Sequence, residues 1–348
     1  MELFEPFSVR TCEALVDDER RAHRYEPVQG RPFSPFEIHD PFGLRNAIVP
    51  VFRQDIEGRM YGLGTAFHMD GFGNFLTAYH VIDFIEQDAA SRPILFLSMH
   101  AVIFGTVNVP PDCFLPIVRT VVPMTDVDDP LAALRGESMR RPAIDVAALR
   151  AAQFGSGVRS PQTLPIRSVG WTPQAGEIVL AVGFPHLDLS EVDDSAQQAL
   201  LSEGMFGAYG RVIEVHPEGT SSSNPTPVFV VESDWPSGMS GGPVFNRNGE
   251  VVGMVSRSLP PEAGNAGVGF AVYFGLIPDL ELLVPTLDKN LPCWRLCWGV
   301  FSEDPYVPSS MHASREDAEV VAKTLNPPGV IKRVSNQIGT EACMEYEQ

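Results

Sequence analysis

Positive charge is scarce in this chain of 348 residues, which has 25 lysines and arginines against 44 aspartates and glutamates, a net charge of −19. The three lysines, Lys289, Lys323 and Lys332, all lie near the C-terminus. A surface of this sign repels phosphate backbones and anionic lipids. We therefore expect neither nucleic acid nor a membrane among its partners.

Long hydrophobic runs and a secretory leader are also missing. No apolar run reaches the length of a transmembrane helix, and the first residues lack a basic segment followed by a hydrophobic stretch. The five cysteines are odd in number and form no C-x-x-C pair. Cys293 and Cys297 have no adjacent histidine, which makes a metal site a poor interpretation. These features favour reduced thiols, a cytoplasmic location and a protein without a metal or cofactor.

Glycines surround Ser240 between two apolar, strand-like segments, residues 228–231 and 251–255. Because glycine has no Cβ, a substrate carbonyl could approach this loop closely. The N–H groups of Gly238 and Ser240 could then converge as an oxyanion hole beside a nucleophilic hydroxyl. Taken alone, the motif also fits an ordinary glycine-rich turn.

Two other residues supply the partners that a nucleophilic serine needs. His80 ends one strand-like segment, and Asp145 lies inside another apolar segment, residues 143–149. The order His80, Asp145, Ser240 is that of the chymotrypsin type and differs from the orders in subtilisin and the α/β-hydrolases. We therefore predict these three as the catalytic residues.

With these motifs the chain resembles the trypsin-like serine peptidases, and among them the HtrA/Deg-like bacterial branch. The resemblance covers roughly residues 45 to 285 and depends on residues 64–67, 77–81, 145–147, 183–185, 240–243 and 267–272. It implies an all-β fold of two six-stranded antiparallel β-barrels of the chymotrypsin type. It also implies a protein or peptide substrate and no cofactor.

The expected division of the chain is an N-terminal extension over residues 1–45, the protease domain over 46–288 and a small α/β appendage over 289–348. The appendage has a β-α-β pattern and is too short for the PDZ domain of typical HtrA proteins. Within the protease domain we expect a strand at 101–104, surface loops at 125–141 and 188–202, and a closing helix at 276–287. The pattern does not determine the oligomeric state.

The function that follows is a serine endopeptidase acting through an acyl-enzyme, a cytoplasmic processing or regulatory protease. The alternative is a catalytically silent trypsin-like fold that binds peptides or acts as a scaffold, and a regulatory partner protein remains open. Met239 precedes the nucleophile, and its thioether cannot pair with a freed N-terminal ammonium. This excludes the zymogen switch of the digestive enzymes.

Substrate specificity has two interpretations. In trypsin-like enzymes the base of the acyl-side pocket lies six positions before the nucleophile, which is Asp234 here, and a carboxylate there would attract arginine or lysine. In the second interpretation Asp234 is structural and Trp235 fills the pocket, which would then take small side chains. Ser256, on the strand after the nucleophile, is a further candidate for contact with the substrate.

Overall fold

The computed structural model describes residues 4–17, 23–39, 44–70, 73–88, 90–96, 113–127, 133–135, 138, 140–151, 162–167, 170–185, 187, 189, 201, 204–221, 225–261, 266–277, 294–312, 314–337 and 341–345. The expected strand at 101–104, Cys293, and nearly all of the expected loop at 188–202 and of the closing helix at 276–287 lie outside these residues.

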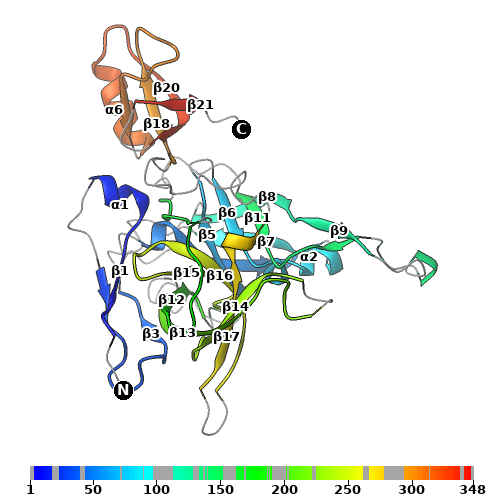
Figure 1. Cartoon of the computed structure of the whole chain (residues 1–348). Helices are drawn as coiled ribbons and strands as arrows, with labels where there is room; N and C mark the ends of the chain where they lie inside the picture. The colour runs from blue at the N-terminus through cyan, green and yellow to red at the C-terminus, as the bar shows by residue number, and fades with distance from the viewer. Residues whose placement is uncertain are drawn as a thin grey trace.

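A closed barrel of six antiparallel strands forms the first half of the molecule (Figure 1). Its strands are, in barrel order, β11 (Ala147–Ala151), β6 (Asn74–Thr77), β5 (Met60–His68), β4 (Ile48–Gln54), β7 (Arg92–Phe96) and β8 (Phe114–Val121). Their β-branched and aromatic side chains fill the interior, where Phe52, Phe67 and Phe75 are fully buried.

The second half is another six-stranded antiparallel barrel. Its strands follow the order β12 (Ile178–Gly183), β15 (Pro243–Phe245), β16 (Val251–Leu259), β17 (Val268–Tyr273), β14 (Val228–Glu232) and β13 (Phe206–His216). A further pairing of β12 with β13 closes the ring. The expected all-β fold of two six-stranded barrels is therefore confirmed.

The N-terminal segment packs against the second barrel. It contains β1 (Phe7–Val9), α1 (Cys12–Asp17), β2 (His23–Tyr25) and β3 (Phe36–Glu37), and β3 pairs with β13. The Tyr209 hydroxyl of β13 donates to the Tyr25 carbonyl at 2.5 Å and accepts from the Phe7 N–H at 2.8 Å. We call residues 4–38 the N-terminal strap; these bonds tie its strands β1 and β2 to one buried tyrosine.

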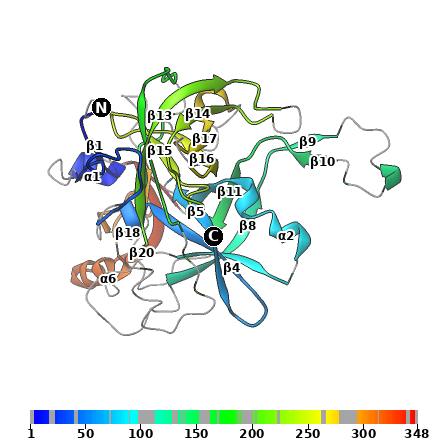
Figure 2. The ribbon, with the colours of Figure 1, turned by 90° about the horizontal axis from the view of Figure 1, so that it is seen from below.

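A hairpin replaces part of the surface loop expected at 125–141. Its strands, β9 (Met124–Asp126) and β10 (Arg140–Pro142), pair antiparallel. They project from the first barrel, as Figure 2 shows. Both strands carry charged side chains and lack hydrophobic alternation, so the sequence did not indicate a hairpin here.

The remaining elements are short turns and the C-terminal appendage. The turns are η1 (Leu44–Asn46), η2 (Tyr79–Val81), α2 (Phe84–Gln87), η4 (Ala133–Arg135) and η5 (Phe274–Leu276). The appendage contains β18 (Trp294–Phe301), β19 (Ser310–His312), α6 (Arg315–Thr324), β20 (Val330–Gln337) and β21 (Cys343–Glu345). The expected β-α-β pattern is present as β18, α6 and β20, and β19 and β21 add short edges to its sheet. Among the described residues, no helix has the length and apolar character needed to cross a bilayer.

Candidate active site

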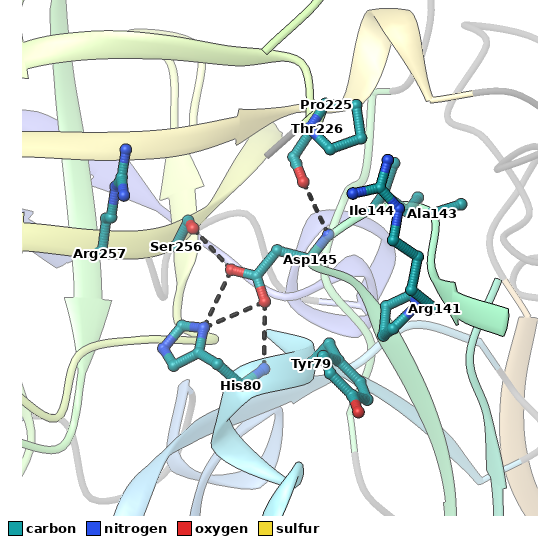
Figure 3. A pocket seen from close by; sticks show the side chains of 11 residues that line it. Tyr79, His80, Arg141, Ala143, Ile144, Asp145, Pro225, Thr226, Ser256 and Arg257 are labelled. Atoms are coloured by element: carbon teal, nitrogen blue, oxygen red, sulfur yellow. Dashed lines mark hydrogen bonds and ion pairs between the residues drawn. The ribbon is translucent and has the colours of Figure 1, made fainter. Parts of the chain in front are cut away.

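Two neighbouring strands of the first barrel bring His80 and Asp145 together. His80 lies on η2, which follows β6, and Asp145 shortly precedes β11, which pairs with β6. The His80 Nδ1 atom is 3.0 Å from each carboxylate oxygen of Asp145, and the His80 backbone N–H donates to Asp145 Oδ1 at 3.1 Å. Figure 3 shows these bonds. They orient the imidazole with its Nε2 edge away from the aspartate.

The Asp145 carboxylate is held by both barrels. Ser256 of β16 donates its hydroxyl to Asp145 Oδ2 at 2.6 Å, and the Asp145 backbone N–H donates to the Thr226 hydroxyl at 2.9 Å. Burial tends to raise the pKa of Asp145, but the hydrogen bonds from His80 and Ser256 and the charge of His80 outweigh it, so this pKa lies below its ordinary value of 3.8. The carboxylate is therefore ionised at neutral pH.

The contact with Asp145 shifts the pKa of His80 upwards, whereas the pKa of Asp145 is lowered. Burial lowers the pKa of His80, yet the hydrogen bond and the negative charge of Asp145 outweigh burial and raise it above 6.5. Asp145 thus stabilises the imidazolium that a general base must become.

Ser240 sits directly after a tight turn that needs glycine. The Met239 N–H donates to the Pro236 carbonyl at 3.3 Å, and Gly238 has a φ of +92°, the combination typical of a type II turn. The Ser240 carbonyl accepts from the Thr65 N–H at 2.8 Å, which ties the loop to the first barrel. A Cβ at Gly241 would lie 2.0 Å from the Thr65 carbonyl oxygen, so only glycine fits there.

Ser256 connects Ser240 to Asp145. The Ser240 hydroxyl donates to the Ser256 carbonyl at 2.9 Å, while the Ser256 hydroxyl donates to Asp145. The sequence suggested a substrate contact at Ser256. In the structure its hydroxyl supports Asp145, a role that no spacing rule in the sequence indicates; the substrate contact stays a prediction. The structure therefore gathers His80, Asp145, Ser240 and Ser256 into one hydrogen-bonded network.

Two backbone donors beside Ser240 face no protein acceptor. Within the part of the chain that is described, the N–H groups of Gly238 and Ser240 donate to no other protein group. Both residues are half-buried, so these donors remain accessible to a ligand. Two unpaired donors at one loop are what an oxyanion hole offers to a substrate.

Cavities lie on both sides of the nucleophile loop. A cavity of about 510 Å³ borders the catalytic candidates and is lined by Tyr79, His80, Arg141, Pro142, Ala143, Ile144, Asp145, Pro225, Thr226, Ser256 and Arg257 (Figure 3). A second one, of about 350 Å³, is lined by Pro50, Val51, Gly62, Leu63, Gly64, Phe184, Leu187, Ser237 and Gly238. The first cavity includes His80 and Asp145, and the second reaches the loop before Ser240.

The segment before the nucleophile agrees with the second interpretation of specificity. Asp234 Oδ1 accepts from the Gly267 N–H at 3.1 Å, so one carboxylate oxygen has a structural partner. Trp235 is 2% exposed, and its indole N–H donates to the Ala208 carbonyl at 3.1 Å. A Cβ at Gly269 would lie 2.3 Å from the indole ring, which shows how closely the ring packs against β17.

His68 is a buried structural histidine. Its Nδ1 atom lies 3.0 Å from the Gln162 carbonyl, and its side chain is fully buried in the first barrel. Burial lowers the pKa of His68 to about 3. It is therefore neutral at neutral pH and takes no part in the network around Ser240.

Comparison with known proteins identifies the family. A model of the trypsin-like peptidase domain matches residues 64–254, more than half of the chain. The periplasmic serine endoprotease DegP of Escherichia coli K12 is 28% identical over 107 residues, which are 31% of this chain and 19% of DegP. A probable periplasmic DegP-like endoprotease of Pseudomonas fluorescens is 28% identical over 162 residues, 43% of this chain and 30% of that protein.

A solved structure is also similar. The Rv3671c protease of M. tuberculosis H37Rv, in an inactive form, is 16% identical and aligns over 69% of this chain and 87% of that one, with a TM-score of 0.40. The chain spans a fifth to a third of the length of the curated relatives it matches. These relatives are periplasmic, which contradicts the cytoplasmic location expected from the sequence. The matched domain and the two barrels together establish that the chain belongs to the family of trypsin-like peptidases.

Proposed function

We propose that the protein is a serine endopeptidase that cleaves protein or peptide substrates with Ser240, His80 and Asp145. The observation that supports this most directly is the hydrogen-bonded network from Asp145 to His80 and, through Ser256, to Ser240. The unpaired N–H groups of Gly238 and Ser240 add the donors that stabilise an oxyanion.

The first half of the reaction begins with a rotation of the Ser240 hydroxyl from the Ser256 carbonyl towards His80 Nε2. The hydrogen bond between a catalytic serine and its histidine is often absent or long before the substrate binds. His80 takes the proton as Oγ bonds to the scissile carbonyl carbon, and the carbonyl electron pair becomes the oxyanion. Each N–H donor to that oxyanion contributes about 3 kcal/mol in sites of this kind.

Collapse of the tetrahedral intermediate breaks the C–N bond. His80 gives its proton to the leaving amine, and an acyl-enzyme remains on Ser240. Water then attacks the ester with His80 as the base, which releases the acid and restores the hydroxyl. Throughout, Asp145 keeps the proton on Nδ1 and offsets the imidazolium charge.

A second candidate is a protein of this fold that binds peptides without cleaving them. The observation that favours it is the Ser240 hydroxyl, which is bonded to the Ser256 carbonyl and not to His80. A regulatory partner that redirects this hydroxyl would connect the two candidates.

A fluorophosphonate probe separates the candidates, because it labels only a serine that a base activates. We expect the wild type to be labelled and to cleave unfolded casein. Ser240→Ala and His80→Ala should reduce turnover at least about 10³-fold. Ser302→Ala, directly after β18 in the C-terminal appendage, is the matched control and should react like the wild type. Casein cleavage by Ser240→Ala equal to that of the wild type would exclude this nucleophile.

A further inference from the structure

The larger cavity beside the catalytic candidates contains two arginines in a chain of net charge −19. Arg257 lies on β16 directly after Ser256, and Arg141 ends the charged part of the β9–β10 hairpin. In the view of Figure 3, Arg257 and Arg141 lie on opposite sides of Asp145. A cavity with this lining attracts negative charge in an otherwise acidic molecule.

The β16 side of the cleft receives the acyl side of the substrate. The specificity segment before the nucleophile belongs to the acyl-side pocket. Here Asp234 of that segment is bonded to Gly267, which leads into β17. Strand β17 pairs with residues 257–259 of β16, so the pocket and Arg257 lie on the same side of Ser240.

The Arg257 guanidinium is oriented before any ligand binds. It stacks over the Phe270 ring, with Cζ 4.5 Å from the ring centroid, and one nitrogen donates to the Thr220 hydroxyl at 3.1 Å. No carboxylate among the described residues lies within ion-pairing distance of it. Arginine has five N–H donors in a planar fork, so several remain for a ligand.

The carboxylate in the same cavity does not neutralise this arginine. Asp145 is occupied by His80, Ser256 and the His80 backbone. Arg257 lies close enough to His80 for its charge to lower the pKa of that imidazole slightly, although Asp145 outweighs it. A substrate carboxylate would therefore meet an oriented cation beside the catalytic base.

We infer that Arg257 is a specificity-determining residue that selects a glutamate or aspartate at the second or fourth position before the scissile bond. The inference rests on the proposed peptidase function. Alternate side chains of an extended peptide share one face, so a peptide that presents one of these positions to Arg257 presents the other on the same side. Arg141 adds positive charge on the far wall.

The apolar lining offers a competing selection. Tyr79, Ile144 and Pro225 also border the cavity and would favour an apolar side chain. A glutamate satisfies both parts of the lining, because its methylenes cover apolar surface while its carboxylate reaches the guanidinium. A glutamine peptide has the same shape without the charge and isolates the electrostatic contribution.

The test uses paired peptides with Glu or Gln at the second and at the fourth position. For the wild type we expect kcat/KM about five- to tenfold higher for Glu than for Gln at one of the two positions. Arg257→Gln should bring the ratio to about one, and Arg257→Glu should favour a Lys peptide over Glu. Arg247→Gln, at the exposed turn before β16, is the control and should keep the wild-type ratio.

Binding to the Ser240→Ala protein separates this inference from the proposed activity. Tighter binding of the Glu peptide than the Gln peptide, lost in Ser240→Ala/Arg257→Gln, supports the inference even if the wild type cleaves nothing. Cleavage by the wild type without a Glu preference overturns the inference and leaves the activity standing. A Glu preference that survives Arg257→Gln, or a preference for Leu over Glu at both positions, also overturns it.

Discussion

The charge of His80 makes the activity of this site depend on pH. Burial lowers its pKa, but the hydrogen bond and charge of Asp145 raise it above 6.5. The base must be neutral, so kcat/KM should increase with pH through an apparent pKa above 6.5. Asp145→Asn removes the charge, so the apparent pKa should fall and kcat should drop about 10⁴-fold.

Peptide hydrolysis measured from pH 5 to 9 checks this prediction in both proteins. A decrease in kcat alone would not distinguish loss of the Asp145 charge from loss of the orientation of the His80 imidazole. The pH profile does, because only the charge shifts the apparent pKa. An acidic limb at or below pH 6.5 in the wild type would contradict the stated effect of Asp145 on His80.

Some residues of the candidate site could be predicted from the sequence and others could not. The approach of His80 to Asp145 could be predicted because a catalytic role demands a specific order and flanking strands. The Ser256 hydroxyl and Thr226 could not, because a serine or threonine that supports a carboxylate has no characteristic spacing. Only the pairing of both barrels at Asp145 brings them there.

At the scale of elements, we expect the loop from Asp234 to Ser240 to determine which side chain enters the acyl-side pocket. Trp235 packs against Gly269 of β17 and belongs to the core of the second barrel. The wild type should therefore prefer glycine or alanine before the scissile bond. Trp235→Leu should open space and raise the ratio of kcat/KM for Leu over Ala peptides at least about tenfold, since a single additional methylene in an apolar pocket is worth that much.

A peptide library profiled with each variant tests this expectation. Trp171→Leu is the matched control: Trp171 packs on Phe229 and Tyr273 in the same barrel, so the change should lower stability without altering preference. Asp234→Asn should leave the profile unchanged. A wild-type preference for arginine that disappears in Asp234→Asn would restore the charged pocket.

Strands were easier to predict than the hairpin that borders the cleft. Residues 294–301 and 268–273 alternate or run apolar, and both form strands. Ser314 accepts from the Asp317 N–H at 3.1 Å and caps the N-terminus of α6. Strands β9 and β10 were not predicted, because their exposed charged residues show no periodic hydrophobic pattern.

For the whole molecule, the two ends of the chain relate differently to the core. The strap contributes Phe7, Val9, Tyr25 and Ile38 to the main hydrophobic cluster. The buried side chains of the appendage instead cluster among themselves, as with Cys297, Phe301 and Val334. Composition could not reveal this difference. The strap is rich in proline and glycine, which predicts an extended segment, and its hydrogen bonds with Tyr209 are visible only in the structure.

The two ends should therefore respond differently to deletion. Four buried side chains of the strap are worth roughly 6–12 kcal/mol at 1.5–3 kcal/mol each, which matches the total stability of about 5–15 kcal/mol typical of a folded domain. Removing residues 1–38 should abolish cooperative unfolding. Removing residues 290–348 should leave it, with a Tm within about 5 °C of that of the full chain. Circular dichroism with thermal melting measures both. Loss of cooperative unfolding in the C-terminal deletion would show that the appendage completes the core, and an unchanged melt in the N-terminal deletion would show that the Tyr209 contacts contribute little.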